Sequence, residues 1–282
     1  MPGLKLTLFS LLLPLLGSSC ALLSPAEKRG PDGKQKTVHL DIGHYVSGNR
    51  GTGAMSPRLP NNDRLEETRF WYKYAPYVRD ELTRAGYGCV ITNRGYAPTG
   101  SPFTDDKGYK SVVQLNRPDT HGRRGSIVRY PSAYHPECRS AGMISADYAI
   151  RQKAVCAVFL HHDSATTSWR TVYRSTILHN RNSGKALAGS IAASLNENVI
   201  GYGDKMPNGG RLCRTAPRSK DGTGGAGWLN TCDKEGMPAA IIEAAQLSTP
   251  EHVRWLYDEN NAIRLARSVG QGIVRYLDSC DK

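Results

Sequence analysis

The sequence has no apolar run that is long enough for a membrane-spanning helix. Such a helix needs about 20 consecutive apolar residues, and the longest apolar run, from Leu6 to Leu16, is shorter and stands at the N-terminus. There is also no internal repeat, no block of lysines and arginines, and no aromatic and basic motif of the known nucleic-acid-binding modules. These absences argue against an integral membrane protein, a repeat protein and a protein that binds nucleic acid.

The composition is that of a soluble globular protein with an excess of positive charge. The 282 residues suffice for one large domain or two small ones, and 39% of them are hydrophobic. The formal net charge is +12. Such a charge indicates an anionic partner, for example a cell-wall polymer or a membrane surface.

The N-terminus has the pattern of a secretory signal. Lys5 precedes the apolar run, and small residues follow it up to Cys20, so we expect residues 1–20 to be a signal peptide. Small residues directly before a cysteine also resemble a bacterial lipoprotein signal, in which Cys20 is lipidated and anchors the chain to a membrane. Leu16 stands one place too far from Cys20 for that pattern, and Gly17 occupies the place of the preferred leucine. Lipidation and ordinary cleavage nearby therefore both remain open.

Six of the seven cysteines follow Cys20, and an even number fits a compartment in which disulfides form. We therefore expect an exported chain that is periplasmic or held in the cell envelope, or else secreted. Scattered structural thiols are the alternative, and the sequence does not choose among the fifteen pairings that six cysteines allow. The six are Cys89, Cys138, Cys156, Cys213, Cys232 and Cys280.

Short apolar runs predict the strands of a single domain over residues 37–282. Residues 21–36, which precede it, carry Pro, Gly and charges without apolar periodicity and are expected to form a flexible tether. Continuous apolar runs are typical of strands in a sheet that is covered on both faces. The four predicted strands are residues 37–42, 87–92, 156–161 and 238–244.

Apolar residues at helical spacing predict three helices between and after these strands. The first covers residues 71–85, and Pro76 within it is expected to kink or split the helix. The second covers residues 183–199. The third covers residues 248–273 and begins with a capping box at Ser248.

Strands that alternate with helices indicate an α/β fold, with a mostly parallel twisted sheet and helices on both faces. Three segments rich in Gly, Pro and Asn are expected to be long loop insertions that frame a site, namely residues 94–146, 164–181 and 202–236. Ligands of such sheets bind beyond the carboxyl ends of the strands.

Four polar residues stand where the predicted elements meet that edge of the sheet: His44, Glu67, His161 and Glu243. Two imidazoles and one carboxylate form a typical catalytic zinc site, which leaves a fourth position for water. A further carboxylate can then take a proton from the attacking water. Taken singly, each histidine could be a hydrogen-bonded structural residue, and Glu66 or Glu67 could be an ordinary solvated helix charge.

Several stretches around these residues match the pattern of a known family. They are "LDIGH", "GTGA", Glu67, "TNR", "FLHHDS" and "GMPAAIIEAAQLSTPEH". Together they resemble the zinc-dependent N-acetylmuramoyl-L-alanine amidases (type 3 catalytic domain), which cut bacterial peptidoglycan, over roughly residues 37–282. The resemblance implies that His44, Glu67 and His161 hold zinc and that Glu243 is catalytic. The stretch "YVRDELTRAGYGCVITN" resembles the helix and strand that follow the glutamate ligand in this family, and this register favours Glu67 over Glu66 as the ligand.

The chain departs from the family pattern near both histidines. Ile42 replaces a proline in the first motif, which should leave the ligand intact, and His162 replaces a small residue after the second ligand. His162 could support the site or compete with His161 as the ligand, and we favour His161. Asp163 then stands where the family has Asn or Asp.

The segment of residues 95–146 is longer than the corresponding link of the family and is basic. Its basic residues either grip the carboxylates of peptidoglycan stem peptides or belong to a solvated loop. They are Lys107, Lys110, Arg117, Arg123, Arg124, Arg129 and Arg139. Aromatic residues of the predicted loops could stack on sugar rings, although exposed loop aromatics often have no specific role; they are Tyr96, Tyr130, Tyr134 and Trp228.

The resemblance implies a monomeric Zn²⁺ enzyme with peptidoglycan as its partner, cleaving the amide bond between N-acetylmuramic acid and L-alanine. Two alternatives remain open. One is a zinc amidohydrolase or peptidase that acts on another anionic substrate. The other is a peptidoglycan-binding lipoprotein that keeps the fold without turnover.

Overall fold

A computed structural model describes the parts of the chain that hold the predicted strands and helices. These parts are residues 26–47, 50–51, 53–59, 64–96, 112–115, 141–163, 176–179, 183–199, 213–215 and 227–281. The predicted signal peptide lies outside them. Within these ranges, none of the helices combines the length and the apolar character that crossing a membrane requires.

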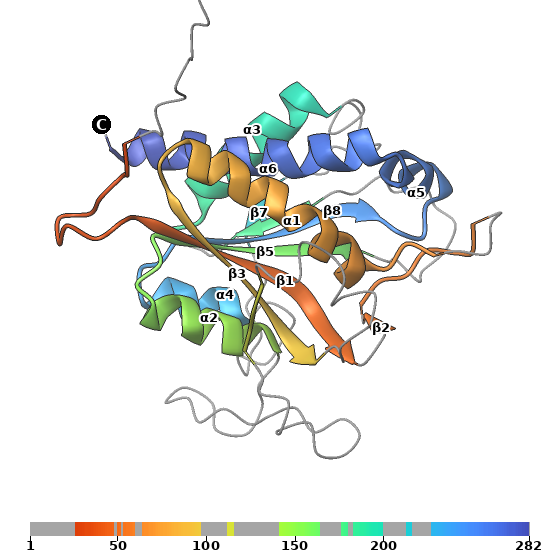
Figure 1. The fold of residues 1–282 in the computed structure, drawn as a ribbon, viewed down its shortest axis with the longest axis horizontal. Helices are drawn as coiled ribbons and strands as arrows, with labels where there is room; N and C mark the ends of the chain where they lie inside the picture. Colours follow the sequence, from red (N-terminus) through yellow and green to blue (C-terminus); the bar gives the residue numbers. More distant parts are fainter. Residues whose placement is uncertain are drawn as a thin grey trace, which may run out of the picture.

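The described strands form one mixed sheet with a parallel centre (Figure 1). They are β1 Thr37–Ser47, β2 Arg50–Gly51, β3 Gly88–Tyr96, β4 Val112–Gln114, β5 Cys156–Asp163, β6 Thr176–His179, β7 Cys213–Thr215 and β8 Ala239–Gln246. The order across the sheet is β4-β3-β1-β5-β8-β6-β7, and β2 pairs with β1. Neighbours from β4 to β8 in this order are parallel, whereas β6 is antiparallel to β8.

Helices cover both faces of this sheet, so the predicted α/β fold class is confirmed (Figure 1). One face carries α1 (Glu67–Arg84), α3 (Lys185–Asn198) and α6 (Glu259–Cys280). The other face carries α2 (Ala141–Arg151) and α4 (Gly227–Lys234), and α5 (Pro250–Tyr257) precedes α6. All four predicted strands are present, as β1, β3, β5 and β8.

Side chains of β1 alternate between the two helical layers, as strand geometry requires. Val38, Leu40 and Ile42 are fully buried in the core under α1 and α6. His39 points to the other layer, where its Nε2 atom is 2.7 Å from the Ser145 hydroxyl of α2. His39 is therefore packed between β1 and α2, at 1% exposure.

Two helix predictions need correction. The first helix is not split, because α1 continues through Pro76 as one helix. The third predicted helix is two helices, since the chain breaks at Asp258, whose carboxylate accepts the N–H groups of Asn260 and Asn261 and caps α6. The capping box at Ser248 does not form, because Thr249 is the N-cap of α5 and makes no side-chain cap.

The three segments predicted as loops contain regular elements where the structure describes them. α2 and β4 lie in the first segment, β6 in the second, and β7 and α4 in the third. α2 and α4 were missed because their buried faces include small residues such as Ala146, Ala149 and Cys232, which give a weak apolar period. The remaining residues of these segments lie outside the described ranges.

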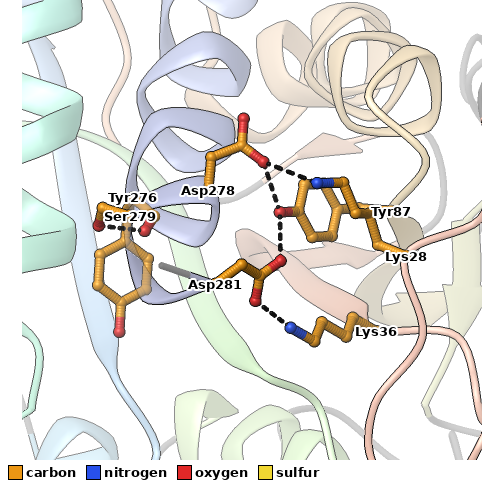
Figure 2. Close-up of polar contacts among 7 residues, drawn as sticks. All are labelled: Lys28, Lys36, Tyr87, Tyr276, Asp278, Ser279 and Asp281. Carbon is orange, nitrogen blue, oxygen red and sulfur yellow. Dashed lines mark hydrogen bonds and ion pairs between the residues drawn. The ribbon is translucent and has the colours of Figure 1, made fainter.

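The described part of the predicted tether is docked on the domain (Figure 2). The Lys28 N–H donates to the Gly86 carbonyl at 2.9 Å. The Lys28 ammonium lies 3.3 Å from Asp278 of α6, and Lys36 pairs with Asp281. These bonds hold residues 26–36 against the amino ends of the strands and the end of α6.

Four of the cysteines expected in disulfides are free thiols: Cys89, Cys156, Cys232 and Cys280. The expected disulfide framework is therefore wrong for these four. Cys156 and Cys232 are buried in different layers of the core, on opposite faces of the sheet.

Candidate metal centre

The structure brings His44, Glu67 and His161 together at the carboxyl ends of β1 and β5. The His44 Nε2 atom is 3.1 Å from Glu67 Oε2, and the His161 Nδ1 atom is 2.9 Å from Glu67 Oε1. One nitrogen of each histidine and one oxygen of Glu67 lie within 4.8 Å of one another. Two imidazoles and one carboxylate at this spacing could hold one metal ion.

The Glu67 carboxylate is the centre of this cluster. It is completely buried, at 0% exposure, as the first residue of α1. Besides the two histidines, its oxygens accept the backbone N–H of Ala54 at 2.6 Å and that of His162 at 3.0 Å. The carboxylate therefore bridges β1, β5 and the segment after β2, and its two oxygens have little freedom to turn.

The electrostatics of the cluster favour positive charge. Burial raises the pKa of Glu67, but the hydrogen bonds from His161 and His44 outweigh it and hold the pKa well below its usual range. Burial likewise lowers the pKa of His161, but the hydrogen bond to Glu67 and the nearby charge of Glu243 outweigh it and raise the pKa overall. A site that stabilises an imidazolium among carboxylates also suits a metal cation.

An irregularity in β1 turns His44 toward the site. His44 has φ of +64°, which is rare for a residue with a side chain, and the pairing of β1 with β3 shifts between Asp41 and Tyr45. The Asn93 side chain donates to the Ile42 carbonyl at 2.7 Å and to the His44 carbonyl at 3.3 Å. These two bonds hold the irregular backbone in place.

Two glycines of the sequence motifs leave room for the cluster. A Cβ atom on Gly43 would lie 2.5 Å from the His161 ring. A Cβ atom on Gly53, which has φ of +102°, would lie 2.4 Å from Glu67 Oε2 and equally close to the His44 ring. Side chains at either position would displace the residues that face the candidate metal.

Glu243 lies beside His161 in the sheet. The two residues are paired in the parallel register of β5 and β8. Ile241, two residues before Glu243, and Phe159, two residues before His161, pack in the same core cluster under α2 and α4. Because side chains two apart in a strand share a face, Glu243 and His161 both face that layer.

His162 does not join the cluster. Its ring is 3% exposed and packs against α1, where its centroid is 4.6 Å from that of Phe70 and 5.3 Å from that of Trp71. Burial lowers the pKa of His162 to about 3, so the ring is neutral at ordinary pH. Of the two adjacent histidines, His161 is the one whose ring nitrogen lies next to Glu67.

Of the aromatic and basic residues singled out in the sequence, Trp228 is the one whose side chain the structure describes. Trp228 of α4 stacks on His161, with ring centroids 6.4 Å apart and an interplanar angle of 19°. The basic residues of the 95–146 segment and the side chains of Tyr96, Tyr130 and Tyr134 lie outside the description.

Sequence reasoning missed several groups that support the cluster. Asn93 belongs to the quoted "TNR" stretch, but its bonds to β1 could not be read from the sequence. Its own Oδ1 atom accepts the Tyr72 hydroxyl at 2.8 Å, and the Thr68 hydroxyl donates to the Gly43 carbonyl at 3.2 Å. Tyr72 and Thr68 follow Glu67 on α1, so the helix that presents the carboxylate also braces the strand that presents His44.

Comparison with solved structures identifies the fold. The chain resembles N-acetylmuramoyl-L-alanine amidase AmiC2 of Nostoc punctiforme with a TM-score of 0.53 and 18% identity, over 86% of this chain and 97% of the other. It also resembles the catalytic domain of the amidase CwlV from Paenibacillus polymyxa with a TM-score of 0.52 and 19% identity, over 86% and 99% of the two chains.

A third similar structure is the CwlD amidase from Clostridioides difficile, solved in complex with the GerS lipoprotein. Its TM-score is 0.55 at 16% identity, over 87% of this chain and 100% of the other. No protein-family model matches the chain. No curated protein matches it at a significant level. At these identities the likeness shows the fold, and the chain therefore has the α/β fold of peptidoglycan amidase catalytic domains.

Proposed function

We propose that the chain is a zinc-dependent N-acetylmuramoyl-L-alanine amidase, which hydrolyses the amide between the lactyl group of N-acetylmuramic acid and L-alanine in peptidoglycan. The observation that carries the proposal is the convergence of two histidines and a buried glutamate, with a second glutamate alongside, at the ligand edge of an amidase fold. Because one fold hosts many functions, these side chains support the activity more specifically than the fold does.

The donor set fits zinc. Zinc in catalytic sites takes three protein ligands of nitrogen and oxygen and keeps a further position for water. His44, Glu67 and His161 offer such a set, and the buried carboxylate supplies negative charge without solvent competition. A zinc ion held by these three residues would supply Lewis-acid polarisation of the scissile carbonyl and activation of water.

The protein residues have two further roles, which are to fix the metal ligands and to transfer a proton. The N–H groups of Ala54 and His162 fix the Glu67 carboxylate, so that the metal ligands need not reorganise during the reaction. Glu243 takes a proton from the attacking water and returns it to the leaving amine of L-alanine. Its position next to His161 in the parallel register supports this role.

The proposed substrate agrees with the predicted export of the chain. Peptidoglycan lies outside the cytoplasm, and its anionic character suits the net charge of +12. We propose that a monomer acts in the periplasm or cell envelope, held to a membrane if Cys20 is lipidated. Changing Cys20→Ser should then release the protein into the soluble fraction. If the variant divides between the membrane and soluble fractions as the wild type does, the protein is secreted without a lipid anchor.

Two other functions remain as outcomes of the test. A zinc peptidase or amidohydrolase on the same scaffold would cut a different bond and leave L-alanine attached to the glycan. A wall-binding lipoprotein would bind peptidoglycan without cleaving it. The presence of both a metal-ligand set and a separate glutamate beside it favours an enzyme over this binding protein.

The test is digestion of purified peptidoglycan, followed by mass spectrometry of the products. We expect free stem peptides that begin with L-alanine, glycan strands with a free lactyl carboxylate, and loss of both products when a chelator removes the metal. Glu67→Gln should abolish bound zinc and product. Glu66→Gln is the matched control, because Glu66 is the neighbouring carboxylate and its side chain makes no cap bond.

Products that still carry L-alanine on the glycan would replace the amidase with a peptidase. Full zinc content in Glu67→Gln would remove this site from the proposal. Absence of any cleavage by the zinc-loaded wild-type protein would favour the binding protein.

A further inference from the structure

The end of β5 that carries His161 is supported by the sheet on the β8 side only. β1 pairs with β5 only as far as Ile42 and Leu160 in the described register. On the other side, the pairing of β5 with β8 shifts between His161 and Asp163. The two adjacent histidines therefore stand where regular strand pairing ends, and other contacts must fix them.

A tryptophan stacks on each of these histidines from an opposite face of the sheet. Trp228, at the start of α4, lies nearly parallel to the His161 ring, with 6.4 Å between centroids and 19° between planes. Trp71 of α1 lies nearly parallel to the His162 ring, with 5.3 Å between centroids and 18° between planes. The end of β5 is thus held between the two helical layers.

The contact with Trp71 links His162 to the helix that presents Glu67. Trp71 follows Glu67 by one helical turn, so both side chains lie on the same side of α1. The backbone N–H of His162 donates to Glu67 Oε1 at 3.0 Å, and the neighbouring His161 Nδ1 atom lies 2.9 Å from the same oxygen. α1 therefore contacts this end of β5 twice, through the stacked ring of Trp71 and through the Glu67 carboxylate.

The His162 ring is held by packing and not by hydrogen bonds. Both of its nitrogens are buried and have no hydrogen-bond partner in the described structure. A buried polar group without a partner destabilises a fold, so a phenylalanine ring would serve the packing equally well. The packing contacts of His162 therefore depend on a flat ring and not on the ring nitrogens.

We propose that Trp71 and Trp228 form an aromatic clamp on the His161–His162 end of β5, and that the clamp positions His161 and the His162 N–H for the metal centre. Trp228 sets the plane of the ligand ring directly. Trp71 acts through His162 and the oxygen of Glu67. Both are positioning residues, and their role rests on the proposed zinc site.

The test uses pairs of variants that keep or remove an aromatic ring. His162→Phe and Trp228→Phe keep a ring, whereas His162→Leu and Trp228→Leu remove it. Trp255→Leu is the control, because Trp255 is a partly buried tryptophan that packs on the core from a third helix, α5. Each protein is measured for zinc affinity by competition with a chromophoric chelator, for the visible spectrum with Co²⁺, and for the unfolding temperature of the metal-free form.

We expect both leucine variants at the clamp to bind zinc about 10-fold to 100-fold more weakly, the range seen when support of a metal ligand is lost. Their Co²⁺ spectra should change, because the ligand ring is no longer held in one plane. Both phenylalanine variants should bind zinc like the wild type, and metal-free His162→Phe should unfold at a higher temperature than the wild type. Trp255→Leu should lower the unfolding temperature without changing zinc affinity.

Unchanged zinc affinity and Co²⁺ spectra in both leucine variants would overturn the clamp. Weak binding by His162→Phe, equal to that of His162→Leu, would also overturn it, because the nitrogens of His162 would then be needed. A wild-type protein that binds no zinc would remove both the clamp and the proposed metal site. A wild-type protein that binds zinc but cleaves no peptidoglycan would remove the amidase function and leave the clamp standing.

Discussion

At the scale of single residues, the two glutamates of the site differ in their surroundings. Glu67 is completely buried and receives two backbone N–H groups and two imidazole contacts. Glu243 ends an apolar stretch of β8 and is only partly buried. A carboxylate whose two oxygens are both held by hydrogen bonds suits a fixed ligand, which leaves the proton transfer to the neighbouring carboxylate.

Changing Glu243→Gln tests this division. Glutamine keeps the size and hydrogen-bonding capacity of the side chain but cannot accept a proton. We expect zinc content and peptidoglycan binding to persist while turnover falls about 100-fold or more. Zinc stoichiometry and muropeptide release are measured on the same preparation. Near-normal release would refute the catalytic role, and loss of zinc would move Glu243 into the ligand set.

His39 makes the stability of the domain depend on pH. Burial lowers the pKa of His39 from its ordinary value of 6.5 to about 3. Between these two values the unfolded chain binds the proton that the folded chain excludes, so the free energy of unfolding falls as the pH falls. The slope from one such group is at most about 1.4 kcal/mol per pH unit.

His39→Gln should flatten this dependence, because glutamine can still bond to Ser145 and does not titrate. Urea unfolding of both proteins at several values between pH 7 and pH 5 measures the difference. Equal slopes for the two proteins would show that His39 is protonated in the folded state or exposed to solvent.

At the scale of elements, the irregular end of β1 is the feature on which the position of His44 depends. α1 and β3 both brace it, through the Thr68 bond to the Gly43 carbonyl and the Asn93 bonds to the carbonyls of Ile42 and His44. A residue other than glycine at positive φ is strained and persists only where its surroundings hold it. The strain at His44 is therefore balanced by neighbouring elements.

Asn93→Ala should loosen this end of β1. The change leaves the Ile42 carbonyl and the Tyr72 hydroxyl without their partner in a buried place, which should destabilise the domain by about 1–3 kcal/mol. We also expect weaker zinc binding, because His44 loses its backbone support. Tyr72→Phe is the control, since it removes the hydroxyl bond and leaves the bonds from Asn93 to β1. Zinc affinity that falls equally in both variants would contradict a role for the Asn93 amide.

The strands and the four site positions could be predicted from the sequence, and several of their supports could not. Strands β1, β3, β5 and β8 are continuous apolar runs, so their burial and the side chains at their ends follow from pattern. α2 and α4 present small residues to the sheet, so the apolar periodicity of their sequences is too weak to predict a helix. The stacking of Trp228 on His161 joins segments far apart in the chain, and only the folded layers bring them together.

At the scale of the whole molecule, the candidate site and the docked N-terminal segment lie at opposite ends of the sheet (Figure 1). The strands end at the metal cluster, whereas residues 26–36 lie at their beginning, beside the end of α6. There the Tyr87 hydroxyl donates to Asp278 at 2.8 Å, next to the pair of Lys36 and Asp281 (Figure 2). Residues 26–36 therefore lie on the side of the domain away from the proposed catalytic edge.

The layered core also predicts which thiols can react. Burial raises the pKa of Cys156 to about 12, and it raises the pKa of Cys89 and Cys232 still further. These three thiols should be neutral in the folded protein and react slowly, because alkylating reagents attack the thiolate, and Cys156 and Cys232 are in addition buried. Cys280, at the end of α6, is exposed and free.

Alkylation of the native protein at pH 8 should therefore modify Cys280 first, and the buried thiols of Cys156 and Cys232 only after denaturation. Peptide mapping by mass spectrometry identifies the modified residues, and Cys280→Ser is the control that removes the early product. The same mapping without reductant, on protein from its native compartment, should find no disulfide that joins any two of the four thiols. A linked pair among them would mean that the oxidised chain packs these layers differently. Rapid native labelling of Cys156 would contradict its burial under α1 and α6.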